Sequence, residues 1–194
     1  MGMALALLAC ARGTGAADVE VAPFAGIQFP GYVNSTGTGR SSSIGIGLDY
    51  GATLDIPVAR GWRIELLYSR QATDVSTRDV GPRIDLVMER YLAGIEEEKD
   101  IGDRTRLFGV FLTGLTRFVP GLDGYDSDVR FTAGLSLGFK HALSKRFGLR
   151  AEGRGFLVVA ESGAGVVCRG GCLFVYSGSG LWQGDLTAGV TMKF

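Results

Sequence analysis

The sequence is poor in the residues that most often carry chemistry. It holds one histidine, three cysteines and five prolines among 194 residues. So few histidines and cysteines leave little material for a metal site, and the absence of a G-x-y period excludes collagen. Its 20 basic and 20 acidic residues cancel, so the basic surface of a nucleic-acid-binding protein is missing. No apolar run reaches the ~18–20 residues of a membrane-spanning helix.

Glycine, by contrast, is abundant. It supplies 31 of the 194 residues, roughly twice its usual share. Apolar residues make up 46% of the chain and the mean hydropathy is +0.20. The chain therefore has ample apolar surface to bury, which excludes disorder, and its length suits one domain.

The N-terminal residues resemble a secretory signal peptide. Met1–Ala11 is apolar, and the small residues at 13–17 follow it, as in an apolar core with a cleavage site behind it. We expect residues 1–17 to be the signal peptide and residues 18–194 to be the mature domain. Two alternatives are a buried N-terminal helix and a lipoprotein signal that places a lipid on Cys10.

Apolar residues alternate with small or polar ones along most of the remaining chain. Between positions 43 and 56 every even position is apolar and every odd position is small or polar. Because side chains on a strand point alternately to opposite faces, this period of two predicts a strand between two different environments. The same period predicts eight strands, at residues 19–29, 43–56, 62–71, 83–95, 104–118, 129–141, 147–159 and 182–194.

Three of these strands contain irregularities. Pro23 lies within the first strand and predicts a bulge or an edge-like break. In residues 83–95 the apolar phase is Ile84, Leu86, Met88 and Leu92, opposite Asp85 and Glu89. Arg90 falls on that apolar phase, which predicts a bulge or the end of the strand there. Residues 104–118 are apolar on both phases, so their faces stay unassigned.

The predicted connections alternate in length. Glycine, serine, proline and aspartate punctuate both the short and the long connections. The short ones are Pro57–Gly61, Glu96–Asp103 and Ala142–Arg146. The long ones are Pro30–Ser42, Thr73–Pro82, Val119–Asp128 and Glu161–Leu181. Short turns at one end and longer loops at the other are typical of a membrane β-barrel.

Glycine and aromatic residues indicate which face points inwards. Glycines such as Gly47 and Gly138 lie on the polar phase, where they would weaken a solvated strand but would help a narrow eight-stranded lumen to pack. On the apolar phase, aromatic residues flank both kinds of connection and form two girdles. One girdle is Trp62, Phe147 and Phe194, and the other is Phe29, Phe131 and Trp182. This favours a transmembrane barrel over a soluble lipocalin-like barrel with an apolar lumen.

These features together resemble the small eight-stranded outer-membrane barrels of Gram-negative bacteria, the OmpA transmembrane-domain and OmpX-like group. The resemblance implies an all-β, eight-stranded, antiparallel, up-and-down transmembrane β-barrel in the outer membrane, with periplasmic termini. In that group a terminal phenylalanine, preceded by apolar residues at alternate positions, is recognised by the barrel-assembly machinery. The matching residues here are Leu186, Ala188, Val190, Met192 and Phe194.

Charged residues on the polar phase should face the lumen and pair there, because an unpaired charge in a narrow interior costs several kcal/mol. The residues expected in lumenal ion pairs are Asp49, Arg63, Glu65, Glu89, Arg150, Glu152, Arg154 and Asp185. Such pairs indicate a plugged lumen rather than a selective pathway. They also explain the carboxylates better than acid/base catalysis does.

The remaining chemistry-bearing residues are few. Some eight-stranded outer-membrane enzymes act on lipid A through a histidine, but His141 lies beside a short turn on the lipid-facing phase, which indicates an interfacial residue. Cys168 and Cys172, spaced C-x3-C in the longest loop, should form a disulfide in an oxidising compartment. No metal ligands accompany them, and Gly45-Ile46-Gly47 lies inside a strand without a following helix, so it is no nucleotide motif.

The sequence thus predicts a monomeric, non-enzymatic outer-membrane barrel with a structural or surface-interaction role, without metal or cofactor. The expected partners are outer-membrane lipid and lipopolysaccharide, the barrel-assembly machinery, and an extracellular ligand on the long loops, since binding residues concentrate on loops held by a rigid scaffold. The alternatives are a narrow porin-like channel for small polar solutes, a lipid A-modifying enzyme, and a soluble ligand-binding barrel.

Overall fold

The computed structural model describes residues 19–29, 42–44, 46–77, 84–121, 127–159, 165–168, 172–175 and 181–194. The predicted signal peptide and Cys10 lie outside these residues. Eight long strands are present: β1 (Glu20–Phe29), β3 (Gly47–Ala59), β4 (Trp62–Thr77), β5 (Ile84–Asp100), β6 (Thr105–Pro120), β7 (Asp128–Ala142), β8 (Phe147–Val158) and β11 (Leu181–Lys193). Three short ones are β2 (Ser42–Ile44), β9 (Gly165–Cys168) and β10 (Cys172–Val175). Among the residues that the structure describes, no helix is long and apolar enough to cross a bilayer.

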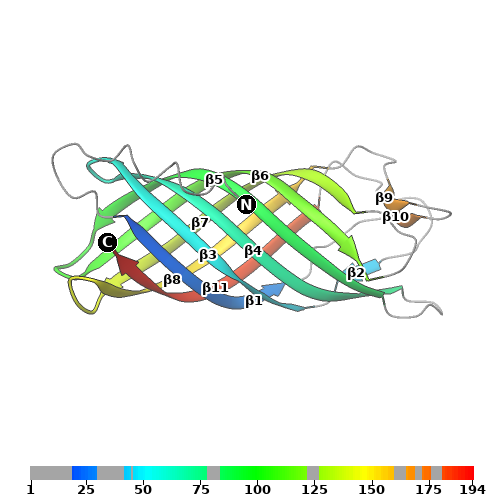
Figure 1. The fold of residues 1–194 in the computed structure, drawn as a ribbon, viewed down its shortest axis with the longest axis horizontal. Coiled ribbons are helices and arrows are strands. Elements are labelled where there is room, and N and C mark those ends of the chain that lie inside the picture. Colours follow the sequence, from blue (N-terminus) through cyan, green and yellow to red (C-terminus); the bar gives the residue numbers. More distant parts are fainter. Residues whose placement is uncertain are drawn as a thin grey trace, which may run out of the picture.

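The eight long strands form one closed antiparallel barrel (Figure 1). Each strand pairs with its neighbours in chain order, from β1 with β3 through to β8 with β11. The barrel closes because β11 also pairs with β1. Closure leaves none of the eight strands with an unpaired edge. The predicted fold class, an eight-stranded up-and-down barrel, is confirmed.

The two ends of the barrel differ, as the connection lengths predicted. Tight turns join β3 to β4 at Arg60–Gly61, β5 to β6 at residues 101–104 and β7 to β8 at residues 143–146. Gly61 has a φ of 77°, a left-handed conformation that glycine adopts without strain. We call this end the turn end. The opposite end, the loop end, is where the strands leading into and out of the longer connections end, and it carries the short strands β2, β9 and β10 (Figure 1).

Three predictions about individual strands need correction. Residues 43–56 are not one strand, because β2 pairs with β4 one residue out of register relative to β3. Pro23 causes no register shift: β1 keeps a constant register with β3. Only the ladder to β11 is interrupted there, because proline has no N–H to donate. Finally, β5 continues to Asp100 with unbroken register, through the segment expected to be a turn.

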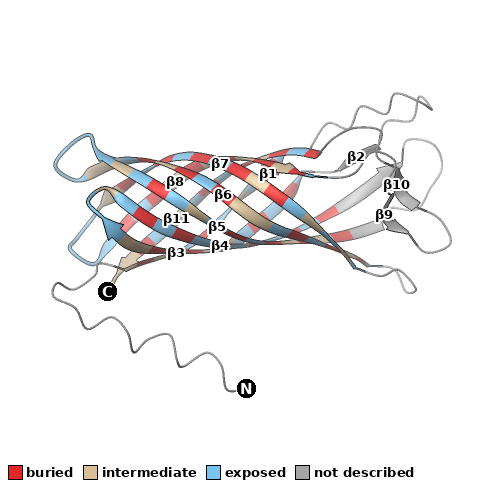
Figure 2. Cartoon of the chain, turned by 90° about the horizontal axis from the view of Figure 1, so that it is seen from above, coloured by how far each residue is buried: buried red, intermediate tan, exposed pale blue. Residues whose placement is uncertain are grey.

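Burial alternates along the strands with a period of two (Figure 2), and most of the exposed strand positions in the middle of the barrel are apolar. Leu135 and Trp182 are 66% and 64% exposed, whereas Glu65 and Asp55 are 0% exposed in the lumen. A soluble barrel has the opposite arrangement. An apolar belt around a polar interior is the arrangement of a barrel that contacts lipid.

The structure corrects the predicted faces of β5 and assigns the faces of β6. On β5 the phase is reversed: Arg90 is fully buried in the lumen together with Leu92, while Glu89 and Tyr91 lie on the outward phase. The predicted bulge at Arg90 is therefore wrong. On β6, which had no assigned face, Phe108 and Leu112 are buried in the lumen and Phe111 is exposed outside.

Candidate functional site

The most highly organised part of the molecule is the lumen, where Lys140 on β7 is the centre of an ion-pair cluster. Its Nζ lies 2.8 Å from Asp55 Oδ2, 2.6 Å from Glu96 Oε1 and 2.8 Å from Glu98 Oε1. The side chain is only 2% exposed. An ammonium group has three N–H donors, and each of these three carboxylates accepts a hydrogen bond from Lys140 Nζ.

Arg150 on β8 is the second centre of the same cluster. Its Nη1 lies 2.9 Å from Asp55 Oδ2 and its Nη2 lies 2.5 Å from Glu65 Oε2. Its Nε donates to Glu152 Oε1 at 3.1 Å. Arg154 also pairs with Glu152. The guanidinium is a planar fork with five donors, which suits it to join carboxylates from opposite walls.

Nearer the turn end, Glu20 on β1 gathers further cations. Its Oε1 lies 2.9 Å from Arg106 Nη2, 3.0 Å from Lys193 Nζ and 3.3 Å from Arg63 Nη2. Arg63 and Arg106 also pair with Glu98. These contacts join β1, β4, β5, β6 and β11 across the lumen, so they tie together strands that are not neighbours in the sheet.

Towards the loop end, Arg90 occupies the lumen with different partners. Its Nη2 donates to Gln183 Oε1 at 2.8 Å. Asp49 lies 4.0 Å from Arg90 Nη1 and 4.0 Å from Arg154 Nη1. Asp185, which is 2% exposed, lies opposite Arg154 in the register of β11 and β8.

Three phenylalanine rings lie against these lumenal cations. The guanidinium carbon of Arg154 lies 4.1 Å from the ring centroid of Phe24, and that of Arg90 lies 4.7 Å from the ring of Phe156. The ring centroid of Phe108 lies 4.3 Å from the guanidinium carbon of Arg150 and 5.1 Å from the Lys140 ammonium. Cation–π contacts of this kind strengthen when water is excluded. The lumen thus contains both ion pairs and aromatic rings.

Lumenal glycines make room for these rings. A Cβ on Gly134 would lie 2.8 Å from Phe156 Cδ1, and one on Gly138 would lie 2.6 Å from Phe108 Cζ. A Cβ on Gly51 would lie 2.9 Å from Phe24 Cζ. Each distance is shorter than real side chains tolerate. The predicted use of glycine, to let a crowded lumen pack, therefore has a specific aromatic partner at each of these positions.

The structure brings most of the predicted lumenal residues together, but not all of them. Arg63, Glu65, Arg150, Glu152 and Arg154 form ion pairs there. Glu89 does not, because it lies on the outward face and pairs with Arg70 and Arg117. The sequence reading placed it inside because the apolar residues on β5 were taken to face lipid.

Several lumenal residues were missed. Glu96 and Glu98 were not predicted to pair because β5 was expected to end before Glu96, Arg90 because it falls on the apolar phase, and Arg106 because the faces of residues 104–118 were unassigned. The signal was present, since Arg90, Gly94, Glu96 and Glu98 continue one strand phase past that point. The lumenal phenylalanines carried no such signal, because phenylalanine is equally suited to lipid and to a packed interior.

Asp55, Glu65 and Glu96 bring three carboxylates within 4.8 Å of one another. Lys140 and Arg150 lie among these carboxylates and contact all three. Their positive charges already occupy the place that a metal ion would take. The arrangement is an ion-pair network in which two cations lie among three carboxylates.

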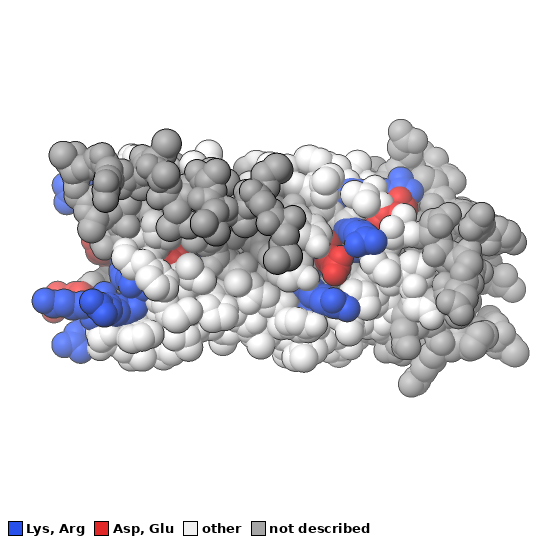
Figure 3. All heavy atoms as spheres, in the orientation of Figure 1, with Lys and Arg blue, Asp and Glu red and all other residues white. Residues whose placement is uncertain are grey.

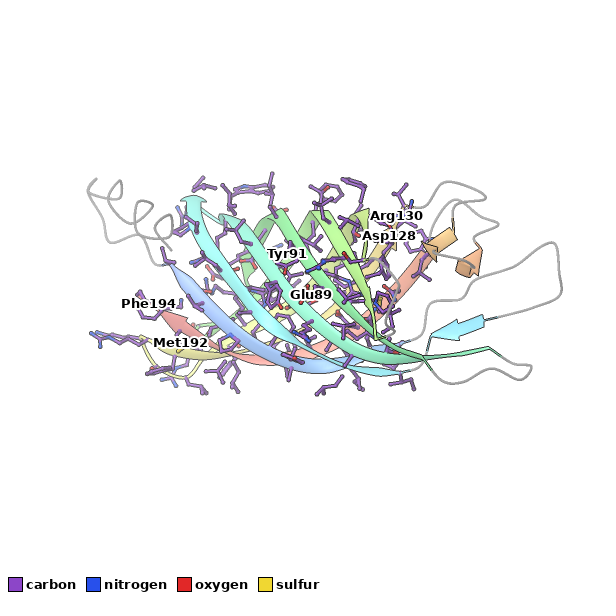
Figure 4. The ribbon with its side chains drawn as sticks, turned by 45° about the vertical axis from the view of Figure 1, so that its right-hand side comes forward. Glu89, Tyr91, Asp128, Arg130, Met192 and Phe194 are labelled. Carbon is purple, nitrogen blue, oxygen red and sulfur yellow. The ribbon has the colours of Figure 1, made fainter. Side chains whose placement is uncertain are left out.

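The other predicted residues lie elsewhere. His141 Nδ1 is 2.9 Å from Thr105 Oγ1, beside the turn end. The backbones of Cys168 and Cys172 are direct partners across β9 and β10; their side chains lie outside the described part of the structure, so the disulfide stays a prediction. Met192 and Phe194 lie at the turn end (Figure 4), and Phe194, Val190 and Leu186 are exposed outside the barrel at 74%, 44% and 53%.

The closed barrel, its apolar exterior and its charged lumen define a class: the chain has the fold of the small eight-stranded outer-membrane β-barrels. No protein-family model matches the sequence, and no curated protein is significantly similar to it. The likeness is found in solved structures.

Three such structures illustrate the likeness. Neisserial surface protein A (NspA) is 18% identical, with a TM-score of 0.67 over 93% of this chain and 99% of that one. The outer membrane protein OprG of Pseudomonas aeruginosa is 14% identical, with a TM-score of 0.56 over 94% and 98%. Outer membrane protein H (OprH) of P. aeruginosa is 22% identical, with a TM-score of 0.51 over 92% and 100%. At these identities the likeness concerns the fold.

Proposed function

We propose that this protein is an integral outer-membrane barrel with a closed lumen and a structural or surface-interaction role. The observation that carries the proposal is the set of buried contacts in the lumen. Ion pairs centred on Lys140 and Arg150 lie there together with the rings of Phe24, Phe108 and Phe156. An eight-stranded barrel is only wide enough for its side chains to fill it, so solutes have no continuous path.

The location rests on the exterior and on the fold. The apolar outward phase fits a bilayer, and the OprG and OprH structures of the same fold are titled outer membrane proteins. We place the turn end and both termini in the periplasm and the loop end outside the cell. The long loops are then the surface that meets an extracellular ligand, and the barrel-assembly machinery and lipopolysaccharide are its partners in the membrane. The protein acts as a monomer without catalysis.

Conductance in planar lipid bilayers tests the closed lumen. The wild-type protein should insert without steady conductance steps. Phe108→Ala removes a buried ring that packs against two lumenal cations and should give brief conductance events. Phe111→Ala is the matched control, since Phe111 lies on the same strand but is 56% exposed outside, and it should stay silent.

Steady conductance of the wild-type protein would overturn the closed lumen and establish the narrow-channel alternative. Fractionation of cells tests the location separately. The protein should remain with the outer membrane and migrate differently on gels before and after heating. Recovery in the soluble periplasmic fraction would overturn the membrane assignment.

A further inference from the structure

The outward face of β4, β5 and β6 carries charges that the lumen does not use. Arg70, Glu89 and Arg117 are direct partners across these strands. Arg70 Nη1 lies 3.7 Å from Glu89 Oε1, and Arg117 Nη1 lies 3.5 Å from Glu89 Oε2. We call these three residues the charged row. Its net charge is positive, because two guanidinium groups share one carboxylate.

Both arginines remain open to the surroundings. Their side chains are 44% and 48% exposed, while that of Glu89 is 13% exposed. On the face of the molecule shown in Figure 3, charged side chains gather towards the two ends, and an uncharged surface separates them. Asp128 and Arg130 lie still nearer the loop end (Figure 4) and pair with each other at 2.8 Å, so they add no net charge.

The charged row lies at the boundary of the apolar belt. From Leu107 to Arg117, β6 advances ten residues. At about 3.3 Å per residue and a tilt of about 45°, this is roughly 23 Å along the barrel axis. An apolar belt of a membrane barrel is about 25 Å tall. Arg70 and Arg117 are therefore positioned to meet lipid head groups rather than lipid tails.

An apolar groove begins directly below the charged row. The next outward row towards the turn end is Tyr68, Tyr91 and Leu115, and the row after it is Leu66, Ala93 and Thr113. The following row is bulky again, with Ile64, Ile95 and Phe111. Ala93 and Thr113 are small side chains between two bulky rows, and they leave a trough across neighbouring strands.

The volume of this trough is substantial. The groove measures about 740 Å³, and its lining includes Ala52, Leu54, Tyr68, Tyr91, Ala93 and Thr113. The rings of Tyr68 and Tyr91 lie 5.2 Å apart at its upper rim, between the groove and the charged row. Tyrosine favours such a boundary because its ring is apolar and its hydroxyl is polar.

We propose that this face binds a phosphorylated lipid. Its phosphate lies between Arg70 and Arg117, its glycerol or sugar backbone lies beside the two tyrosines, and one acyl chain lies in the groove. Arginine binds phosphate through parallel N–H donors. Glu89 holds the two guanidinium groups at a fixed spacing, so less rotamer freedom is lost when the lipid binds. The charge of the row selects an anionic head, and the groove selects a lipid over a soluble phosphate.

The inference rests on the proposed membrane location and is independent of whether the lumen conducts. Native mass spectrometry of the detergent-solubilised protein tests it, with phosphatidic acid and phosphatidylcholine of identical acyl chains as probes. The wild-type protein should retain phosphatidic acid about tenfold more than phosphatidylcholine. Arg70→Gln with Arg117→Gln should abolish that preference, and Ala93→Phe, which fills the groove, should reduce retention of both lipids.

Two further variants make the result specific. Arg104→Gln with Arg146→Gln removes the same charge from exposed turns at the opposite end and should leave binding unchanged. Arg70→Lys with Arg117→Lys keeps the charge but loses the planar fork, and should recover part of the preference for phosphatidic acid. Each variant is first shown to fold by its heat-dependent gel migration, and the lysine variant serves if the glutamine variant does not fold.

Three outcomes would overturn the proposal. The first is unchanged preference for phosphatidic acid in the glutamine variant. The second is an equal loss in the control variant at the turn end, which would mean that charge alone attracts the lipid. The third is displacement of bound lipid by millimolar inorganic phosphate, which would leave the groove without a role. If lipid binds as expected while the wild-type protein conducts ions, the closed lumen fails and the lipid site stands.

Discussion

At the scale of single residues, the packing of the lumen depends on close contacts between a glycine and a phenylalanine. Gly138 faces Phe108 and Gly134 faces Phe156 at distances that leave no space for a Cβ. The sequence predicted that glycines on the polar phase let the lumen pack, because position and residue type are both visible in it. It did not predict the phenylalanines, since only the packed neighbour distinguishes an inward ring from an outward one.

This pairing predicts that adding one methyl group changes the free energy of unfolding by different amounts at two glycines on adjacent strands. In Gly138→Ala the new Cβ would meet Phe108 Cζ at 2.6 Å and the Ala151 carbonyl oxygen at 2.5 Å. Overpacking of this kind costs about 1–3 kcal/mol. In Gly155→Ala the new Cβ meets nothing within 4 Å, so the free energy of unfolding should change by less than about 0.5 kcal/mol.

Urea unfolding in lipid vesicles, followed by tryptophan fluorescence, measures both values. Trp62 and Trp182 lie on the outward face and report the transfer of the belt from lipid to water. Equal stability of the two variants would contradict the packing role assigned to Gly138.

At the scale of the strand, β5 shows how far alternation can be read. Strands with a polar inner face, such as β3 and β11, were assigned correctly. On β5 and β6 the inner face also carries apolar residues, including Leu92, Phe108 and Leu112. The alternation with a period of two then persists, but it no longer shows which phase faces the lipid. Hydropathy does not distinguish a side chain in lipid from one in a packed apolar interior. Only the register with neighbouring strands fixes which face is inside.

The C-terminal strand gives a prediction about assembly rather than stability. Phe194 is 74% exposed outside the barrel, and its backbone N–H donates to the Val19 carbonyl oxygen, a bond that any side chain permits. Phe194→Gln should therefore leave the free energy of unfolding within about 0.5 kcal/mol of the wild type. Its assembly by the purified barrel-assembly machinery should nevertheless become several-fold slower.

Phe147→Gln is the matched control for this strand. Phe147 also lies outside the barrel at the turn end, with 51% exposure, but it belongs to β8. If both variants assemble equally slowly, the effect is one of interfacial aromatics in general, and the assembly signal does not reside in the terminal residue.

At the scale of the whole molecule, closure of the barrel underlies both the height of the apolar belt and the packing of the lumen. Charged side chains pair with one another inside the closed barrel, so the outer surface is free to match the lipid. Its belt, roughly 23 Å between Leu107 and Arg117 by strand rise and tilt, is shorter than the about 30 Å of an average bilayer core. It suits a thin membrane, and mismatch costs fractions of a kcal/mol per Å.

The belt height predicts how stability depends on lipid length. Unfolding in vesicles should need more urea in phosphatidylcholine with 12-carbon chains than with 18-carbon chains, because the thicker bilayer must thin around the barrel. Replacing Arg70, Glu89 and Arg117 together by leucine extends the belt by about one row on three strands, roughly 5 Å along the axis. The optimum should then move to longer chains. An optimum that stays at the same chain length in this variant would show that the charged row does not set the upper boundary of the belt.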